Sequence, residues 1–221
     1  MDQHDMLTSL RSAIEPALVP VEPLGRPNAR AIWLMAAFLV LIGGVLAVFG
    51  PRPDVELPGL WEYVGLSILQ VFGAYALVVV SLRLSMPALP TSPSTALAWI
   101  AIALSVHLFI SWVAQERSAT SPMGHEWTTG LACLGAIALL FLAPLALGAV
   151  MLRRGLVIRR LLAFALIGLS SALGAEAAWR LHCDYSAWDH VVPFHSGALL
   201  LLTFVAVGAA VKLGRRDRSA R

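Results

Sequence analysis

The sequence predicts an all-α fold, a polytopic membrane bundle of six transmembrane helices preceded by a short cytoplasmic segment. Composition is the first reason: 58% of the 221 residues are apolar and only 13% are charged, about half the charged fraction of a soluble domain. The second reason is that the apolar residues gather in six long stretches, and about 20 apolar residues are enough to cross the hydrocarbon core. Lipid is therefore the expected solvent, which excludes a soluble catalytic domain over most of the chain.

Short connections rich in proline or glycine separate the spans, because both residues interrupt helices. They contain Pro51, Pro53 and Pro58, then Pro87, Pro90 and Pro93, then Pro122 and Gly124. In chain order, the spans are expected at residues 31–49, 62–84, 95–114, 127–150, 158–179 and 191–212. Pro144 lies inside the fourth span and should kink it. The chain thus divides into a segment of residues 1–30, a transmembrane domain of residues 31–212 and a basic tail of residues 213–221.

The distribution of basic residues orients the bundle. If the N-terminus is inside, thirteen of the sixteen Lys and Arg residues fall on the inner side, and only Arg52, Arg117 and Arg180 fall outside. This bias follows the positive-inside rule and places both termini in the cytoplasm. Tryptophans then lie at both interfaces, at the helix ends: Trp33 and Trp99 inside, and Trp61, Trp112, Trp127 and Trp179 outside. No basic patch is interleaved with aromatic residues, so we expect no direct contact with nucleic acid.

The first thirty residues are polar and lack the short apolar region of a signal peptide, so the first span is expected to be retained. Leu7, Leu10 and Ile14 recur at helical spacing, between Asp5 as an N-cap and Pro16 as a stop. The proline-rich stretch that follows should be extended. Two interpretations remain open for this short amphipathic helix: it docks in the groove of a partner protein, or it lies on the membrane surface.

Two cysteines are expected on the outer side of the membrane. Cys133 lies about two turns into the fourth span and Cys183 in the last outer loop. If that side is an oxidising compartment, the two could form a disulfide. The alternative interpretation is that each cysteine is a small buried hydrophobic residue.

Further titratable residues surround Cys183. His182, Asp184, His190 and His195 lie within the same short segment, and His125 and Glu126 lie in the preceding outer loop. Thiol and imidazole groups are ligands for zinc, cadmium or copper, but the spacing matches no standard zinc motif, and a solvated loop of polar residues is the alternative. Within the spans, His107 and Glu176 could pair with each other. For Glu176 we favour the simpler expectation that it extends to the interface beside Trp179 and Arg180.

Three features together resemble the NrsF family of bacterial membrane proteins, negative regulators of extracytoplasmic-function (ECF) sigma factors. They are the N-terminal helix followed by the Pro20–Leu24 stretch and Pro27, the six spans, and the pair Cys133 and Cys183 with His190, Pro193 and His195 after it. The resemblance implies an anti-sigma factor of the inner membrane. It also implies that the N-terminal segment holds the sigma factor and that the two cysteines sense metal or oxidative stress. Relatives carry a tryptophan where Phe194 stands here, which leaves the role of that aromatic residue open.

The resulting hypothesis is a membrane-bound stress sensor that is not an enzyme. Its sensor thiols are Cys133 and Cys183, with His182, His190, His195 and Asp184 as candidate metal ligands or neighbours of the ligands. Leu7, Leu10 and Ile14 are the candidate contacts to an ECF sigma factor. We expect no permanent cofactor, although a thiophilic metal could bind transiently, and the expected partners are the sigma factor and the lipid bilayer, with the oligomeric state left open. Two alternatives are a small-molecule or metal transporter, and a membrane redox protein: a haem protein that uses His107 with His195, or a thiol oxidase, which the absence of a CxxC motif disfavours.

Overall fold

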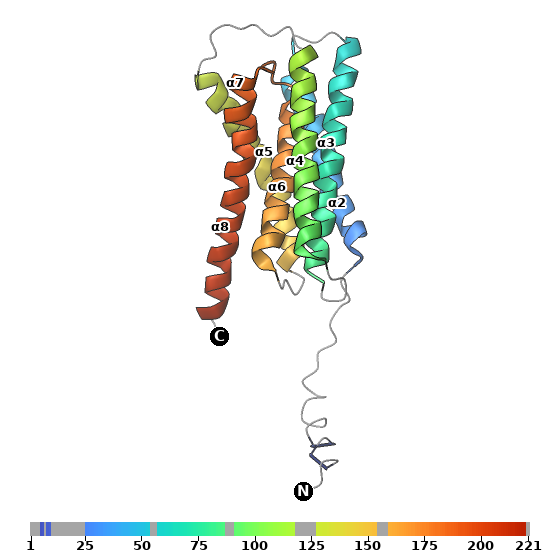
Figure 1. Cartoon of the computed structure of the whole chain (residues 1–221), viewed down its shortest axis with the longest axis vertical. Coiled ribbons are helices and arrows are strands. Elements are labelled where there is room, and N and C mark those ends of the chain that lie inside the picture. The colour runs from blue at the N-terminus through green and yellow to red at the C-terminus, as the bar shows by residue number, and fades with distance from the viewer. Residues whose placement is uncertain are drawn as a thin grey trace.

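The computed structural model of the chain is a bundle of long helices (Figure 1). It describes residues 5–6, 8–9, 25–53, 57–86, 91–117, 127–153 and 159–219, and for residues 57–58, 60, 117 and 213–219 the backbone alone. All elements within these ranges are helical: α2 (Pro27–Phe49), α3 (Leu57–Leu84), α4 (Pro93–Arg117), α5 (Trp127–Arg153), α6 (Arg160–Trp179), α7 (Trp188–His190), the π-helix η2 (Val191–Ser196) and α8 (Gly197–Ser219). Six of the helical segments are long and apolar enough to cross a membrane. The predicted fold class, an all-α bundle of six spans, is confirmed.

The ends of the first five predicted spans agree with the observed helices to within a few residues. The sixth span differs, because the single helix expected from residue 191 begins as η2 and becomes α-helical only at Gly197. Pro193 explains the difference. It has no N–H to donate to the carbonyl four residues earlier, and its ring clashes with that carbonyl, so the turn around it widens.

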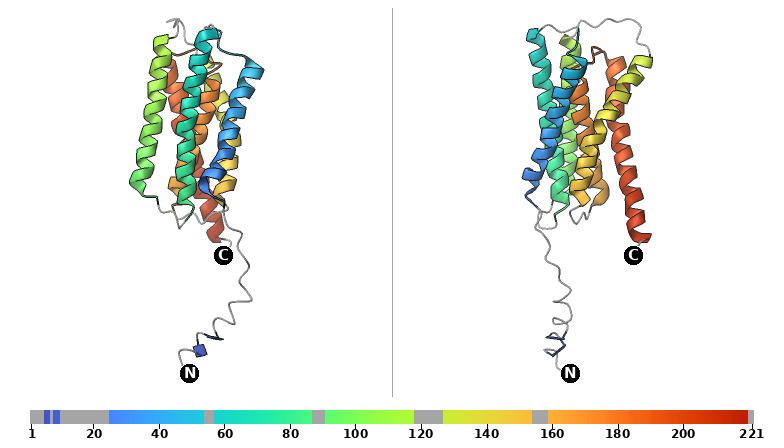
Figure 2. Two further views of the ribbon diagram at one scale, coloured as in Figure 1. Left: turned by 90° about the vertical axis from the view of Figure 1, so that its right-hand side faces the viewer. Right: turned by 180° about the vertical axis from the view of Figure 1, so that it is seen from behind.

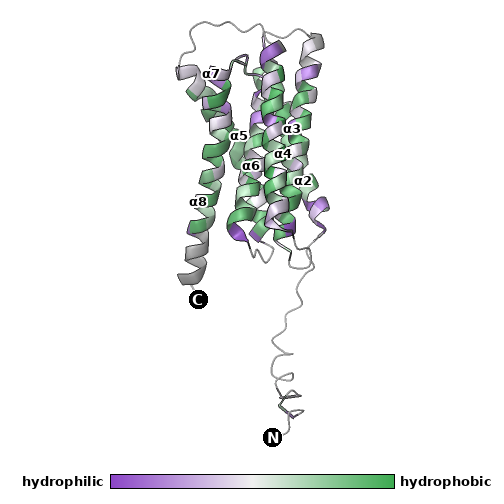
Figure 3. Cartoon of the chain, in the orientation of Figure 1, coloured by the Kyte–Doolittle hydropathy of each residue, from purple (hydrophilic) through white to green (hydrophobic). Residues whose placement is uncertain are grey.

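Both described ends of the bundle lie at the same end of the molecule (Figures 1 and 2). We call the end at which α2 begins and α8 finishes the basal end, and the opposite one the distal end. The hydrophilic residues gather toward both ends and the middle is apolar (Figure 3). The lateral surface exposes large apolar side chains such as Val40, Leu139 and Phe204. This is the distribution that lipid on all sides requires.

Helix α6 is the central helix of the bundle. It packs against α3, α5, α8 and α2, and 83% of its apolar window is buried, against 22–44% in the other five spans. Its sequence is rich in small residues, including Gly168, Gly174 and the run Ala175–Ala178 broken only by Glu176. Small side chains let neighbouring backbones approach closely, which is how helices pack in lipid.

Gly174 provides a test of this packing. A Cβ atom at this position would lie 2.3 Å from Cδ1 of Phe38, a fully buried residue of α2. We expect Gly174→Val to lower the free energy of unfolding by about 1–3 kcal/mol, because the ring must move out of a filled core. Unfolding by SDS titration in mixed micelles would measure the loss. Gly135→Val is the matched control, since nothing lies within 4 Å of its Cβ position; equal stability of the two variants would contradict the close α2–α6 packing.

Candidate functional site

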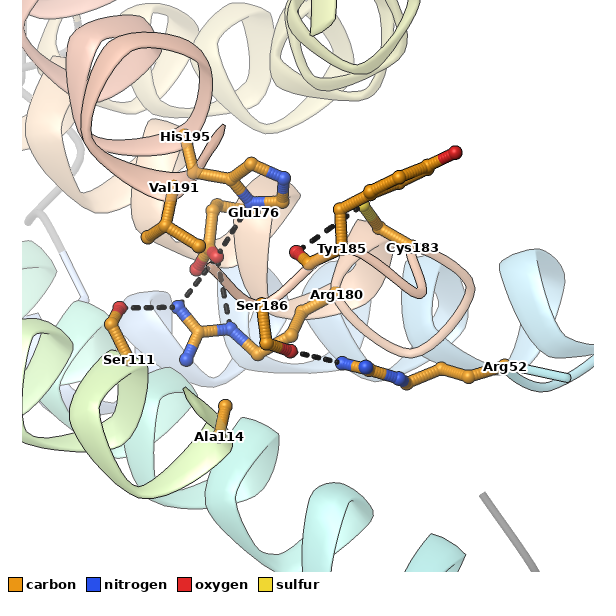
Figure 4. Close-up of a pocket in the computed structure, with 10 residues that line it drawn as sticks. All are labelled: Arg52, Ser111, Ala114, Glu176, Arg180, Cys183, Tyr185, Ser186, Val191 and His195. Atoms are coloured by element: carbon orange, nitrogen blue, oxygen red, sulfur yellow. Dashed lines mark hydrogen bonds and ion pairs between the residues drawn. The ribbon is translucent and has the colours of Figure 1, made fainter. Parts of the chain in front are cut away.

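The segment after α6 is fixed against the distal end by Arg52, which follows α2. The Arg52 side chain is only 2% exposed. It donates from Nη1 to Ser186 Oγ at 3.0 Å and from Nη2 to the Asp184 carbonyl at 3.0 Å, and its guanidinium lies 4.5 Å from the centre of the Tyr63 ring. Figure 4 shows Arg52 reaching Ser186 at the edge of the site. These contacts hold the loop that carries Cys183 over the end of the bundle.

Cys133 of α5 and Cys183 of this loop lie together. Their Sγ atoms are 3.5 Å apart, both residues are buried, and both are free thiols. The hydrogen bond to Cys133 and the burial of the side chain raise the pKa of the Cys183 thiol well above its ordinary range. Because the thiolate is the reactive form, we expect Cys183 to react slowly with alkylating reagents at neutral pH. The structure therefore brings the two predicted sensor thiols together; the sensing role itself stays a prediction.

The π-helix brings His190 and His195 to the same two sulfur atoms. Residues five apart in an α-helix point about 140° apart, whereas in a π-helix residue i bonds to residue i+5 and the two lie nearly above each other. The Nε2 atoms of His190 and His195 are accordingly 3.2 Å apart, and His190 Nε2 is 3.5 Å from Cys183 Sγ. The His190 ring stacks on Tyr185 and also contacts Phe194, which fixes its orientation.

The four side chains form one buried group, which we call the Cys2His2 cluster: Cys133, Cys183, His190 and His195. Each offers one donor atom, and the four donor atoms all lie within 4.8 Å of one another. Sulfur and imidazole nitrogen suit soft and borderline metal ions. The sulfur pair is also placed for oxidation, because its atoms are already in van der Waals contact. The arrangement can thus bind a metal ion or form a disulfide.

Glu176 of α6 lies directly beneath this cluster, and the expectation that it extends to the interface is wrong. The residue is fully buried. Its carboxylate accepts hydrogen bonds from Arg180 Nε at 2.9 Å and Nη2 at 2.6 Å, and it lies 3.1 Å from His195 Nδ1, as Figure 4 shows. Gln70 of α3 also donates to it. Arg180 follows one turn later on the same helix and folds back onto the carboxylate, so the two charges neutralise each other inside the bundle.

His107 completes the polar network on the side of α4. Its Nδ1 lies 3.6 Å from a Glu176 oxygen and 3.3 Å from Arg180 Nη2, so the pairing of His107 with Glu176 that the sequence left open is present. Its Nε2 contacts Ser196 Oγ at 3.0 Å. Arg180 also donates to Ser111 at 3.2 Å. Since both ring nitrogens of His107 are engaged by protein groups, the arrangement disfavours a bis-histidine haem with His195.

The remaining predicted site residues lie elsewhere. His182 stands outside the Cys2His2 cluster: its Nδ1 is 3.3 Å from the Gly50 carbonyl oxygen, and its ring contacts Trp179. The Asp184 side chain is exposed, and the residue contributes its backbone carbonyl to Arg52. The candidate sigma-binding residues and the outer-loop pair fall outside the described residues: Leu7, Leu10, Ile14, His125 and Glu126.

Three residues of the site escaped sequence reasoning in that role. The sequence did not indicate that Gln70 and Arg52 belong to the site, because the partners of a single polar residue in or beside an apolar helix cannot be recognised from the sequence. Phe194 now has a place: it packs over Gly130 of α5, where a Cβ atom would lie 2.2 Å from its ring, and it meets Trp127 edge to face at 5.3 Å. It thereby joins η2 to α5 beside the cluster. Glu176 and Arg180 did carry a signal, since opposite charges four residues apart share one helix face.

The model of a protein family described as NrsF, negative regulator of sigma F, matches residues 17–215 of this chain. Neither the curated proteins nor the solved structures contain a match.

Proposed function

We propose that this chain, which belongs to the NrsF family of negative regulators of sigma F as the sequence resemblance predicted, is an inner-membrane anti-sigma factor for an ECF sigma factor. In this proposal, Cys133 and Cys183 control its activity. A negative regulator of a sigma factor has a sigma factor as its partner. The family is one of regulators, which supports a regulatory role for this chain. The observation that carries the sensing part is the contact of two thiols from separate elements, 50 residues apart in the chain.

The proposed sigma-binding element is the N-terminal segment of residues 1–30. Its supports are the helical spacing of Leu7, Leu10 and Ile14 and the positive-inside bias, which puts it in the cytoplasm with the sigma factor. Its residues 27–30 already form the first turn of α2, the helix whose Phe38 packs against Gly174 of α6. A change in the bundle can therefore reach the segment through a single helix.

The full-length protein in detergent should capture its sigma factor from lysate of the source bacterium, and Leu10→Asp should abolish capture, because it places a charge in the apolar face. Ser12→Asp is the matched control: it adds the same charge on the opposite side of the expected helix and should retain capture. Quantitative co-precipitation measures both. Equal capture by the two variants would contradict docking through this face, and failure of the native protein to bind any sigma factor would contradict the anti-sigma function.

The proposed signal is a change in bonding at the thiol pair. Oxidation by hydrogen peroxide converts the two thiols into a disulfide and reduces the peroxide to two molecules of water. The sulfur atoms must move from 3.5 Å apart to about 2.05 Å. That movement draws the loop before α7 toward α5, and the loop's neighbours His190 and His195 lead on to Glu176, which is buried at the distal end of α6. Switching the segment from mostly bound to mostly free takes about 5.5 kcal/mol of differential stability between the two arrangements of the bundle.

A further inference from the structure

The Cys2His2 cluster has the composition and burial of a structural metal site. Its four donor atoms come from α5, the loop after α6, α7 and η2, and all four residues are at most 5% exposed. Two sulfurs and two imidazole nitrogens in a closed group are a donor set that structural zinc sites use. We propose that Cys133, Cys183, His190 and His195 hold one resident divalent ion of the zinc class in tetrahedral coordination. The meaning of this ion for regulation rests on the function proposed above.

The distances between the donor atoms fit that coordination. Metal bonds of about 2.3 Å to sulfur and about 2.0–2.1 Å to nitrogen give tetrahedral edges of about 3.8 Å between sulfurs, about 3.6 Å between sulfur and nitrogen and about 3.3 Å between nitrogens. The corresponding separations here are 3.5 Å for Cys133–Cys183, 3.5 Å for Cys183–His190 and 3.2 Å for His190–His195. These three edges lie within a few tenths of an ångström of the values for a bound ion, and the other three are at most 4.8 Å.

The Glu176 carboxylate gives an independent reason. It lies 3.1 Å from Nδ1 of His195, on the side of the ring opposite the cluster, so Nδ1 carries the proton and donates it to the carboxylate. Nε2 then presents its lone pair to Cys133, Cys183 and His190. Metal-bound histidines regularly donate their second N–H to a carboxylate, which fixes the tautomer and raises the basicity of the ligand. Arg180 and Gln70 hold the carboxylate in turn.

Charge balance favours the ion at this depth. Two thiolates neutralise a divalent cation, so the complex adds no net charge to a site in which all four side chains are buried. The ion would join α5, the Cys183 loop and η2 through four bonds, and so hold the resting arrangement of the distal end. Oxidation of the two thiolates to a disulfide by hydrogen peroxide, with uptake of two protons and formation of two waters, removes both sulfur ligands and releases the ion. Release of the metal ion and release of the sigma factor would then follow from the same oxidation of the two thiolates.

The test uses full-length protein, purified in detergent under reducing conditions, stripped of bound metal with a chelator and then titrated with Co²⁺, whose tetrahedral thiolate complexes absorb visible light. We expect saturation at one Co²⁺ per chain, d–d bands of tetrahedral intensity, a thiolate-to-cobalt charge-transfer band and displacement of Co²⁺ by Zn²⁺. Cys133→Ser should weaken binding at least tenfold and reduce the charge-transfer band. His190→Cys supplies a fourth donor again, so it should keep the tetrahedral bands and strengthen the charge-transfer band.

His182→Gln is the control, because His182 lies beside the cluster without belonging to it, and it should bind Co²⁺ like the native protein. Absence of tetrahedral bands in the folded native protein, or bands that Cys133→Ser leaves unchanged, would overturn the metal site and leave a hydrogen-bonded thiol–imidazole chain in its place. Capture of the sigma factor is measured on the same samples. Metal binding without sigma capture would reject the proposed function alone, and capture with oxidant-driven release but no metal would reject the metal site alone.

Discussion

Replacement of Glu176 by alanine should lower the free energy of unfolding by about 3–5 kcal/mol, because it leaves the Arg180 guanidinium buried without its counter-charge. The carboxylate is fully buried and meets Arg180, His195, Gln70 and His107 at one point. Unfolding in mixed micelles, followed by circular dichroism during an SDS titration, would measure the loss.

Two comparisons make this prediction specific. Glu116→Ala removes an exposed carboxylate of α4 and should change stability by no more than about 0.5 kcal/mol. The double variant Glu176→Ala with Arg180→Leu removes both charges and should recover part of the loss, since an apolar pair can replace a buried ion pair. A single Glu176→Ala variant as stable as Glu116→Ala would contradict the central position assigned to this carboxylate.

Oxidation of the reduced protein should join Cys133 to Cys183 within one chain and release the sigma factor, and serine at either position should block both effects. The chain contains only these two cysteines, so a maleimide reagent that adds mass reports their state directly. Unfolded samples should take up two labels when reduced and none after oxidation. Co-precipitated sigma factor should fall by at least tenfold in the oxidised native protein and stay constant in Cys133→Ser.

The serine variants distinguish a disulfide that forms within one chain from a disulfide that forms between two chains. If Cys133→Ser and Cys183→Ser form disulfide dimers on oxidation, the thiols react between chains, and the close pair in the bundle is not the sensor. If the native protein loses both labels yet keeps its sigma factor, the disulfide forms without transmitting a signal. Either result would contradict the proposed switch while leaving membership of the family untouched.

The sequence predicted the bundle because hydropathy is a local property. Each span can be recognised from its own run of about 20 apolar residues, and prolines mark the connections. The ends of α2 to α6 could therefore be placed to within a few residues. The start of the sixth span could not be placed, since the turn widened at Pro193 also depends on how Phe194 of η2 packs over Gly130 of α5.

The candidate site could be predicted only in part, because its members meet through the tertiary fold. Cys133 and Cys183 could be identified because they are the only two cysteines in the sequence. His190 and His195 could be identified because they are potential metal ligands close to Cys183 in the sequence. His182 and Asp184 looked equally suitable in sequence, yet the short loop turns His182 toward Gly50 and leaves Asp184 at the surface. Glu176 was misplaced because the sequence shows that Arg180 follows it by one turn but does not show whether the pair faces lipid headgroups or the interior.

The central position of α6 has a consequence for the biogenesis of the protein. This helix combines the lowest mean hydropathy of the six spans, 1.7, with the highest burial, and it carries Glu176 and Arg180 at its distal end. A translocon that partitions each nascent helix by its own affinity for lipid would insert α6 poorly as an isolated segment. Its insertion should therefore be cooperative. Helices α3 and α5 emerge from the ribosome earlier and pack against α6 in the folded bundle. They can therefore provide a protein surface, in place of lipid, for α6 to contact as it enters the membrane. A helix selected for contact with protein on every side depends on its neighbours to enter the membrane at all.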